Sequence, residues 1–139
     1  MPKELQMVRN LIEVAMSGYN LTRFMPLSLG TLTNISKLTL SNNQISGHIP
    51  SAIGKLVNLE VLAPDSNSLY GSIPREIGNL VNLEILALDS NSLSGSIPCE
   101  IFKLLNLETL TPGNNSLSGS ISNFRGVRKL IFVVQTLEK

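Results

Sequence analysis

The chain has 139 residues, a length typical of one domain, and 42% of them are hydrophobic, which is enough to supply a core. Charged residues make up only 15%, and 11 Lys and Arg against 10 Asp and Glu leave a net charge of +1. This balance gives no electrostatic reason to expect nucleic acid or an anionic membrane surface as a partner. One cysteine excludes an intrachain disulfide and a Cys-rich zinc site, and one histidine leaves too few groups for most metal-dependent or acid–base enzymes.

Targeting signals are not found in the sequence. The first ten residues contain no apolar stretch of the length that a secretory signal needs. The most apolar segment, residues 130–134, is far shorter than the roughly 18 apolar residues of a membrane span. The sequence therefore predicts a chain without a signal peptide, a transmembrane helix or any membrane insertion of its own.

An internal repeat governs most of the sequence. The blocks 35–58, 59–82 and 83–106 align without an insertion, block 107–130 begins in the same register, and 11–34 is a more diverged copy. Each block follows the pattern L-x-x-L-x-L-x-x-N-x-L, then S-G-x-I-P, then an apolar-Gly-x-Leu segment. We therefore divide the chain into a partial repeat at 1–10, five 24-residue repeats over 11–130 and a degenerate C-terminal end at 131–139.

Each repeat opens with x-L-x-L-x, whose alternation predicts a short strand with its leucines inward and their neighbours outward. In chain order the predicted strands lie at 13–17, 37–41, 61–65, 85–89 and 109–113. Gly and Pro at fixed places between them predict 3₁₀ turns and extended pieces, including a second short strand near the S-G segment, in place of a full α-helix. Because one unit cannot bury its own apolar side, the expected fold class is an α/β solenoid with a parallel sheet on its concave face.

Residues at the end of each strand carry a second signal. An asparagine at one fixed position can satisfy, through its side-chain amide, backbone groups that the turn would leave unpaired. These structural asparagines are Asn43, Asn67, Asn91 and Asn115, and Tyr19 takes their place in the first repeat. Pro64 and Pro112 replace the second inward leucine, where the missing N–H and the smaller side chain should weaken a central strand.

The stretches SNNQISGHIPSAIGKLVNL and DSNSLSGSIPCEIFKLLNL resemble the plant-specific leucine-rich repeat, with S-G-x-I-P elements at 46–50 and 94–98. That class occurs in the ectodomains of plant receptor-like kinases and receptor-like proteins and in polygalacturonase-inhibiting proteins. The resemblance covers roughly residues 1–121. It implies a right-handed superhelix and an extracellular or plasma-membrane parent, whose strand-bearing face binds peptides, steroids or proteins. The cysteine-paired cap and kinase domain of the family are not found here, which favours an internal or truncated segment.

The outward residues of the strands form the candidate ligand-binding face. They are Lys37, Thr39, Val61, Ala63, Asp65, Ile85, Ala87, Asp89, Thr109 and Thr111. In the middle of this face an aliphatic pair is followed by two alanines and two aspartates, which suits a ligand with an apolar side chain beside a basic group. The alternative is an ordinary solvated sheet, and the face has neither an aromatic residue nor an arginine as an anchor.

No cofactor, metal or catalytic site is expected. Glu60, Glu84 and Glu108 recur just before the strands, but stacked carboxylates without further oxygen ligands make a poor Ca²⁺ site. His48 and Cys99 lie two repeats apart, hence ~10 Å or more along the stack, which is too far for a nucleophile and its base. Cys99 is predicted to be an exposed free thiol, and the chain is not expected to be an enzyme.

Three N-x-Ser/Thr sequons begin at Asn20, Asn34 and Asn114, and these are possible glycosylation sites if the chain is secreted. The predicted function is a recognition module that binds a protein or peptide ligand, resembling a plant receptor ectodomain of signalling or defence. Two alternatives stay open. One is an enzyme inhibitor in the manner of the polygalacturonase-inhibiting proteins, and the other is a non-functional truncated remnant.

Overall fold

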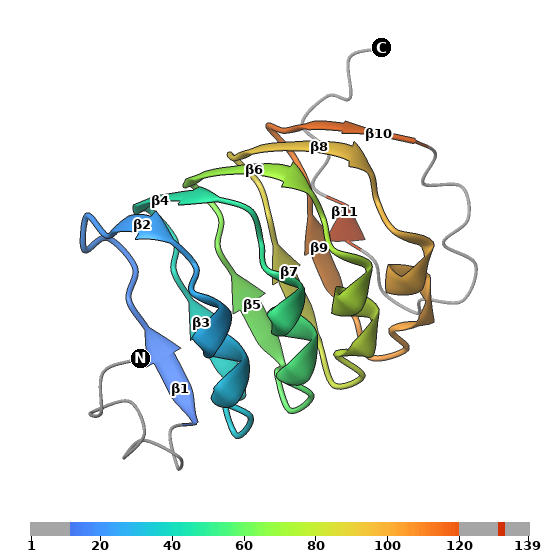
Figure 1. The fold of residues 1–139 in the computed structure, drawn as a ribbon. Helices are drawn as coiled ribbons and strands as arrows, with labels where there is room; N and C mark the ends of the chain where they lie inside the picture. Colours follow the sequence, from blue (N-terminus) through green and yellow to red (C-terminus); the bar gives the residue numbers. More distant parts are fainter. Residues whose placement is uncertain (1–11, 120–130, 133–139) are drawn as a thin grey trace.

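The structure is a computed structural model that describes residues 12–119 and 131–132. Within these residues the chain winds through successive coils, each of which adds one strand to each of two parallel sheets (Figure 1). Short 3₁₀ helices follow the second strand of a coil, and none of the described residues is α-helical. The predicted solenoid, with its parallel concave sheet and its 3₁₀ returns, is confirmed. The predicted partial repeat at 1–10 lies outside the described residues.

The elements occur in a fixed order in every coil. The concave sheet is formed, in spatial order, by β1 (Glu13–Ala15), β3 (Lys37–Thr39), β5 (Val61–Ala63), β7 (Ile85–Ala87), β9 (Thr109–Thr111) and β11 (Ile131–Phe132). The second sheet is formed by β2 (Thr22–Phe24), β4 (Gln44–Gly47), β6 (Ser68–Ser72), β8 (Ser92–Ser96) and β10 (Ser116–Ser118). The 3₁₀ helices are η1 (Leu27–Thr31), η2 (Ser51–Lys55), η3 (Arg75–Asn79) and η4 (Cys99–Lys103).

The inward leucines of the concave strands lie one above another. Leu38 pairs with Leu62, Leu62 with Leu86 and Leu86 with Leu110, so the partner always occupies the same position of the next repeat. All four side chains are at most 1% exposed. Each coil therefore buries its apolar side against its neighbours, as a solenoid requires.

The second sheet has a different register. Thr22 lies opposite Gln44 and Tyr70 opposite Ser92, so partners in this sheet are closer in sequence than one full repeat. Equivalent repeat positions are consequently displaced along this sheet by two residues from one coil to the next. The sequence period cannot reveal this shift, because it constrains only the length of the coil.

The S-G-x-I-P element ends the second strand and begins the 3₁₀ helix. In the second repeat Gly47 adopts a φ of +81°, a conformation that a side chain disfavours, and Pro50 then precedes η2 in an extended conformation. The helix closes with a bond of 3.0 Å from the Ile53 N–H to the Pro50 carbonyl. In the first repeat the glycine position is occupied by Arg23, which adopts a φ of +88°. At this repeat position the first coil thus stores backbone strain that the later coils avoid with glycine.

Pro64 is buried at the end of β5 and interrupts one row of the concave ladder. Leu40 donates to the Ala63 carbonyl and Leu88 to the Thr111 carbonyl, each at 2.9 Å, but Pro64 between them has no N–H to donate. Pairing between β5 and β7 ends at Leu62 and Leu86, one residue earlier than in the pairs on either side. The sheet continues across this defect.

The concave strands are three residues long, or two in β11, which is shorter than the predicted stretches. Asp65 and Asp89 therefore lie in the turns that follow β5 and β7, and not in the strands as the sequence pattern suggested. The reason is local, because Ser66 and Ser90, which follow the two aspartates, adopt φ values of +55° and +57° and turn the chain away from the sheet.

Candidate functional site

The concave face places the aliphatic pair side by side. Val61 and Ile85 are directly paired residues of β5 and β7, and both side chains point away from the core. Ile85 remains 37% exposed, and Ala63 and Ala87 lie half-buried at the other end of the two strands. The result is a small apolar strip across two neighbouring strands.

Two carboxylates border this strip, each oriented by a hydroxyl group. Ser41 donates to Asp65 Oδ1 at 2.6 Å, and Thr111 donates to Asp89 Oδ1 at 2.7 Å. Both aspartates are half-buried, and they occupy the same position of neighbouring coils, whose strands lie about 4.8 Å apart. Among the described residues, no Lys or Arg forms an ion pair with either of them, since the ion pair found there joins Arg75 to Glu76.

The remaining predicted ligand-binding residues flank the strip. Lys37 and Thr39 lie on β3, with Lys37 opposite Val61 and exposed to solvent. Thr109 and Thr111 lie on β9, opposite Ile85 and Ala87. The structure thus places eight of the ten predicted residues on four adjacent strands of one sheet, and Asp65 and Asp89 in the turns that follow two of these strands.

The turn asparagines hold each coil to the one before it. Asn67 donates from Nδ2 to the carbonyls of Leu40, Pro64 and Asp65 at 2.9, 3.0 and 3.1 Å, and its Oδ1 accepts from the Ile45 N–H at 3.0 Å. Three further asparagines make the same set of bonds in their own coils: Asn43, Asn91 and Asn115. This row therefore joins the turns of successive coils, and its amide groups are engaged with the backbone.

Residues weighed for other chemistry lie apart from this face. Cys99 is a free and exposed thiol at the start of η4, as predicted. The sequon asparagines are all exposed: Asn20, Asn34 and Asn114. Glu60, Glu84 and Glu108 are exposed too, and no group of three His, Cys, Asp or Glu within the described ranges could hold a metal ion.

Sequence reasoning missed two features of the first coils. The register of the second sheet brings His48 beside Tyr70, with ring centroids 4.8 Å apart, although the two residues occupy different repeat positions. An apolar cavity of about 340 Å³ opens at the first coil, between Val14, Leu21 and Leu29. One signal in the sequence could have pointed to the first coil. There, larger residues such as Phe24 replace the polar residues that later repeats have at the same positions.

The structure has the features that define a leucine-rich repeat protein: parallel strands that recur once per repeat, an asparagine row at the turns and 3₁₀ returns. The chain belongs to the leucine-rich repeat family. The sequence profile of that family matches residues 34–56 and 82–104. Among curated proteins, none matches this chain in sequence. No helix in the described part of the chain has the length and hydrophobicity to cross a membrane.

Solved structures of plant receptor ectodomains are similar to the chain. One is the ectodomain of the Arabidopsis thaliana receptor kinase GASSHO1/SCHENGEN3 in complex with CASPARIAN STRIP INTEGRITY FACTOR 2. It is 34% identical in sequence with a TM-score of 0.88, and the match covers 95% of this chain and 16% of that one. A chain of the BIR3–SERK2 complex from Arabidopsis thaliana is 35% identical with a TM-score of 0.78, covering 87% of this chain and 67% of that one.

A third similar structure is the Arabidopsis receptor kinase HAESA in complex with the peptide hormone IDA and the co-receptor SERK1. It is 33% identical with a TM-score of 0.80, and the match covers 99% of this chain and 24% of that one. The chain therefore spans about a sixth of the GASSHO1/SCHENGEN3 ectodomain and about a quarter of the HAESA ectodomain.

Proposed function

We propose that the chain is a non-catalytic recognition module whose concave face binds an extended peptide or protein segment outside the cell. An aliphatic side chain of the ligand lies over Val61 and Ile85, and a neighbouring Lys or Arg of the ligand pairs with Asp65 and Asp89. The similarity to HAESA supports this proposal, because that structure is a complex with the peptide hormone IDA, and the GASSHO1/SCHENGEN3 structure is a complex with CASPARIAN STRIP INTEGRITY FACTOR 2.

The observation that carries the proposal is the pair of half-buried carboxylates. Each one is held by a hydroxyl donor, so its position is set before a ligand arrives. Neither has a cationic partner among the described side chains, so both carboxylates can accept a basic group of a ligand. A basic group of a ligand gains the most binding free energy beside these carboxylates, whereas the phosphates of a nucleic acid would be repelled.

Binding to an array of synthetic extended peptides tests the proposal. The array pairs sequences that contain Leu-x-Arg with sequences in which Glu replaces Arg, and we expect retention of the Arg members. The double variant Asp65→Asn, Asp89→Asn should weaken binding about tenfold or more, because charge-assisted hydrogen bonds contribute about 1.5–3 kcal/mol.

The matched control is Glu60→Gln, Glu84→Gln, which removes the same charge from exposed positions just before the same two strands. This control should bind like the unmodified chain. If both double variants lose the same amount of peptide binding, the effect is due to net charge and not to the site. Equal retention of the Arg and Glu peptides would refute the proposed site.

A further inference from the structure

Two aromatic rings lie side by side on the outer face of the second sheet. The centroids of the His48 and Tyr70 rings are 4.8 Å apart, and the ring planes meet at 65°. Both side chains are exposed, and Tyr70 keeps 50% of its surface open to solvent. Because edge-to-face contacts of this kind are favourable, each ring helps to orient the other. We call this pair the aromatic platform.

Both residues of the aromatic platform depart from the repeat pattern. Ser72 takes the place of His48 in the next repeat, and Ser94 takes the place of Tyr70. The two aromatic residues belong to different repeats and to different repeat positions. They meet because the strands of the second sheet pair two residues short of a full repeat. Two separate replacements of serine thus combine into one surface feature.

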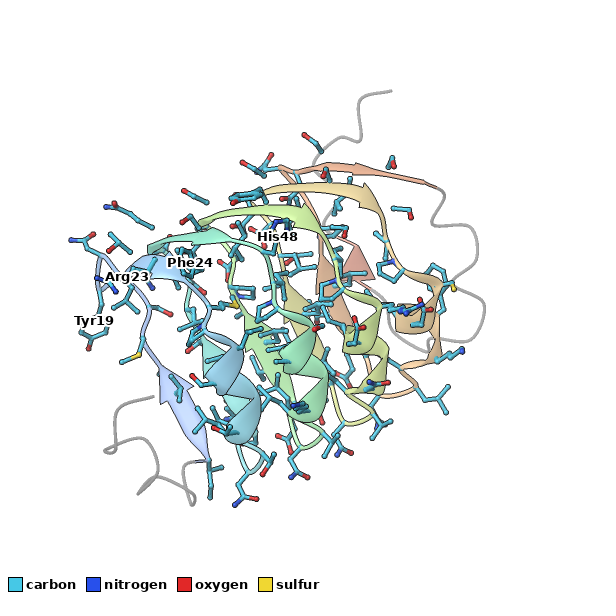
Figure 2. The ribbon with its side chains drawn as sticks, in the orientation of Figure 1. Tyr19, Arg23, Phe24 and His48 are labelled. Atoms are coloured by element: carbon cyan, nitrogen blue, oxygen red, sulfur yellow. The ribbon has the colours of Figure 1, made fainter. Side chains whose placement is uncertain are left out.

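The backbone beside the aromatic platform fixes the imidazole ring. A Cβ atom at Gly71 would collide with His48 Nδ1, so the ring lies directly against this glycine. One coil earlier, a Cβ atom at Gly47 would lie 3.0 Å from the Cβ of Phe24. Figure 2 shows Phe24 and His48 on the layer of the second sheet. The His48 ring is held between the backbone and Tyr70, so the platform is in place before a ligand arrives.

Hydroxyl groups surround the aromatic platform. Ser92 of β8 lies directly opposite Tyr70 of β6. All the serines of these two strands are exposed: Ser68, Ser72, Ser92, Ser94 and Ser96. Strands β4, β6, β8 and β10 contain no Lys, Arg, Asp or Glu. This part of the second sheet therefore offers aromatic surface and hydroxyl groups without any charge.

We propose that this face binds a neutral polysaccharide, with one sugar ring stacked on the aromatic platform. One face of a pyranose ring consists of C–H groups, which leave water when they pack against an aromatic ring. The hydroxyl groups of the sugar point outward from its rim, where serine hydroxyls can both donate and accept hydrogen bonds. The serines extend over two strands, which suits a chain of several sugars.

The absence of charge distinguishes this ligand from others. A nucleic acid base also stacks on tyrosine, but the phosphates need Lys or Arg beside the ring. An anionic polysaccharide has the same need. An apolar protein surface would leave the serine hydroxyls without hydrogen-bond partners. The platform belongs to a different sheet from the concave face, so this inference does not rest on the proposed function.

Tyrosine fluorescence tests the aromatic platform directly, because the chain has two tyrosines and no tryptophan. In Tyr19→Phe the emission comes from Tyr70 alone. Titration of this variant with hydroxyethyl cellulose or galactomannan, two soluble neutral polysaccharides, should give a saturable change. In Tyr70→Phe the emission comes from Tyr19, which is 70% exposed and which Figure 2 shows apart from His48. The same titration should leave this emission unchanged.

Native electrophoresis in gels that contain the same polysaccharides measures binding itself, relative to a gel without them. We expect the unmodified chain to be retarded, and His48→Ser, Tyr70→Ser to bind about tenfold more weakly. Both changes install the residue that the next repeat has at the same position, and circular dichroism establishes that the variant is folded. The control Asp65→Asn, Asp89→Asn alters only the concave side and should be retarded like the unmodified chain.

Three results would overturn the proposal. The first is no retardation by either neutral polysaccharide, and the second is stronger retardation by the anionic polygalacturonate. The third is equal loss of binding in the platform variant and in the aspartate control. If the platform variant does not fold, the two Tyr→Phe chains decide the question, because both keep all the rings. Equal fluorescence changes in these two chains, or none in either, would also refute the site.

The peptide array tests the concave face independently of all these results.

Discussion

Replacing one turn asparagine should destabilise the whole stack. Asn67 connects two coils at the middle of the solenoid, and it satisfies the Ile45 N–H and the carbonyls of Leu40 and Pro64. Asn67→Ala leaves the Ile45 N–H without its partner in a half-buried turn, whereas the Leu40 carbonyl keeps its bond from Asn43 and the Pro64 carbonyl keeps its bond from Asn91. Because an unpaired donor costs about 1–3 kcal/mol, the free energy of unfolding should fall by about 2 kcal/mol, a sizeable part of the usual 5–15 kcal/mol.

A matched control separates this role from the loss of any asparagine. Asn58 makes one exposed bond, from Nδ2 to the Thr33 carbonyl at 2.9 Å, so Asn58→Ala should cost less than about 1 kcal/mol. Asn67→Asp tests the donor separately. Its carboxylate keeps the bond to Ile45 but turns an oxygen toward the carbonyls of Leu40 and Pro64, and it should destabilise at least as much as Asn67→Ala.

Urea unfolding followed by far-ultraviolet circular dichroism is the suitable assay, because the chain has no tryptophan to report by fluorescence. The slope of the transition must stay constant for the midpoints to be compared as stabilities. If Asn67→Ala and Asn58→Ala lower the midpoint equally, the hydrogen-bond argument is refuted, and the asparagine row would have to act by turn propensity alone.

Two further variants should raise stability. The first is the double variant Pro64→Leu, Pro112→Leu, in which leucine at position 64 regains the N–H for the Ala87 carbonyl and adds buried volume. Its thermal midpoint should rise by the equivalent of about 1–2 kcal/mol. An unchanged or lower midpoint counts against a packing defect at the prolines. The second is Arg23→Gly, which relieves a φ of +88° and should stabilise the folded chain by about 1 kcal/mol. The control Thr22→Gly, one residue earlier in β2, should destabilise it. Calorimetry that gives both changes the same sign would contradict the strain argument.

Much of the candidate site could be predicted from the sequence because each of its residues sits at a counted repeat position. Once Leu62 and Leu86 are assigned inward, their neighbours Val61 and Ile85 must face outward, and the sequence period places them on adjacent strands. The hydroxyl contacts were beyond this reasoning. Ser41 reaches Asp65 from the preceding coil, whereas Thr111 reaches Asp89 from the following one, and no pattern within a repeat distinguishes these directions.

The open end of the core illustrates the opposite case. Val14, Leu21 and Leu29 are ordinary core residues by their repeat positions, and the sequence pattern predicts that they are as buried as Leu38. Their exposure depends on whether a neighbouring coil lies against them, which is a property of the stack and not of the residue. Likewise, the contact between His48 and Tyr70 arises because the second sheet pairs its strands in a register shorter than the sequence repeat.

The sequence by itself determined the coil length, the inward leucines, the asparagine turns and the proline-initiated 3₁₀ helices, because each depends on interactions within one repeat or with its immediate neighbour. Tertiary structure alone decided the strand offsets, the shortened pairing at Pro64 and the exposed apolar end. These depend on how whole coils tilt and cover one another. A period in the sequence records which residues recur, but a residue is buried only where a second surface covers it.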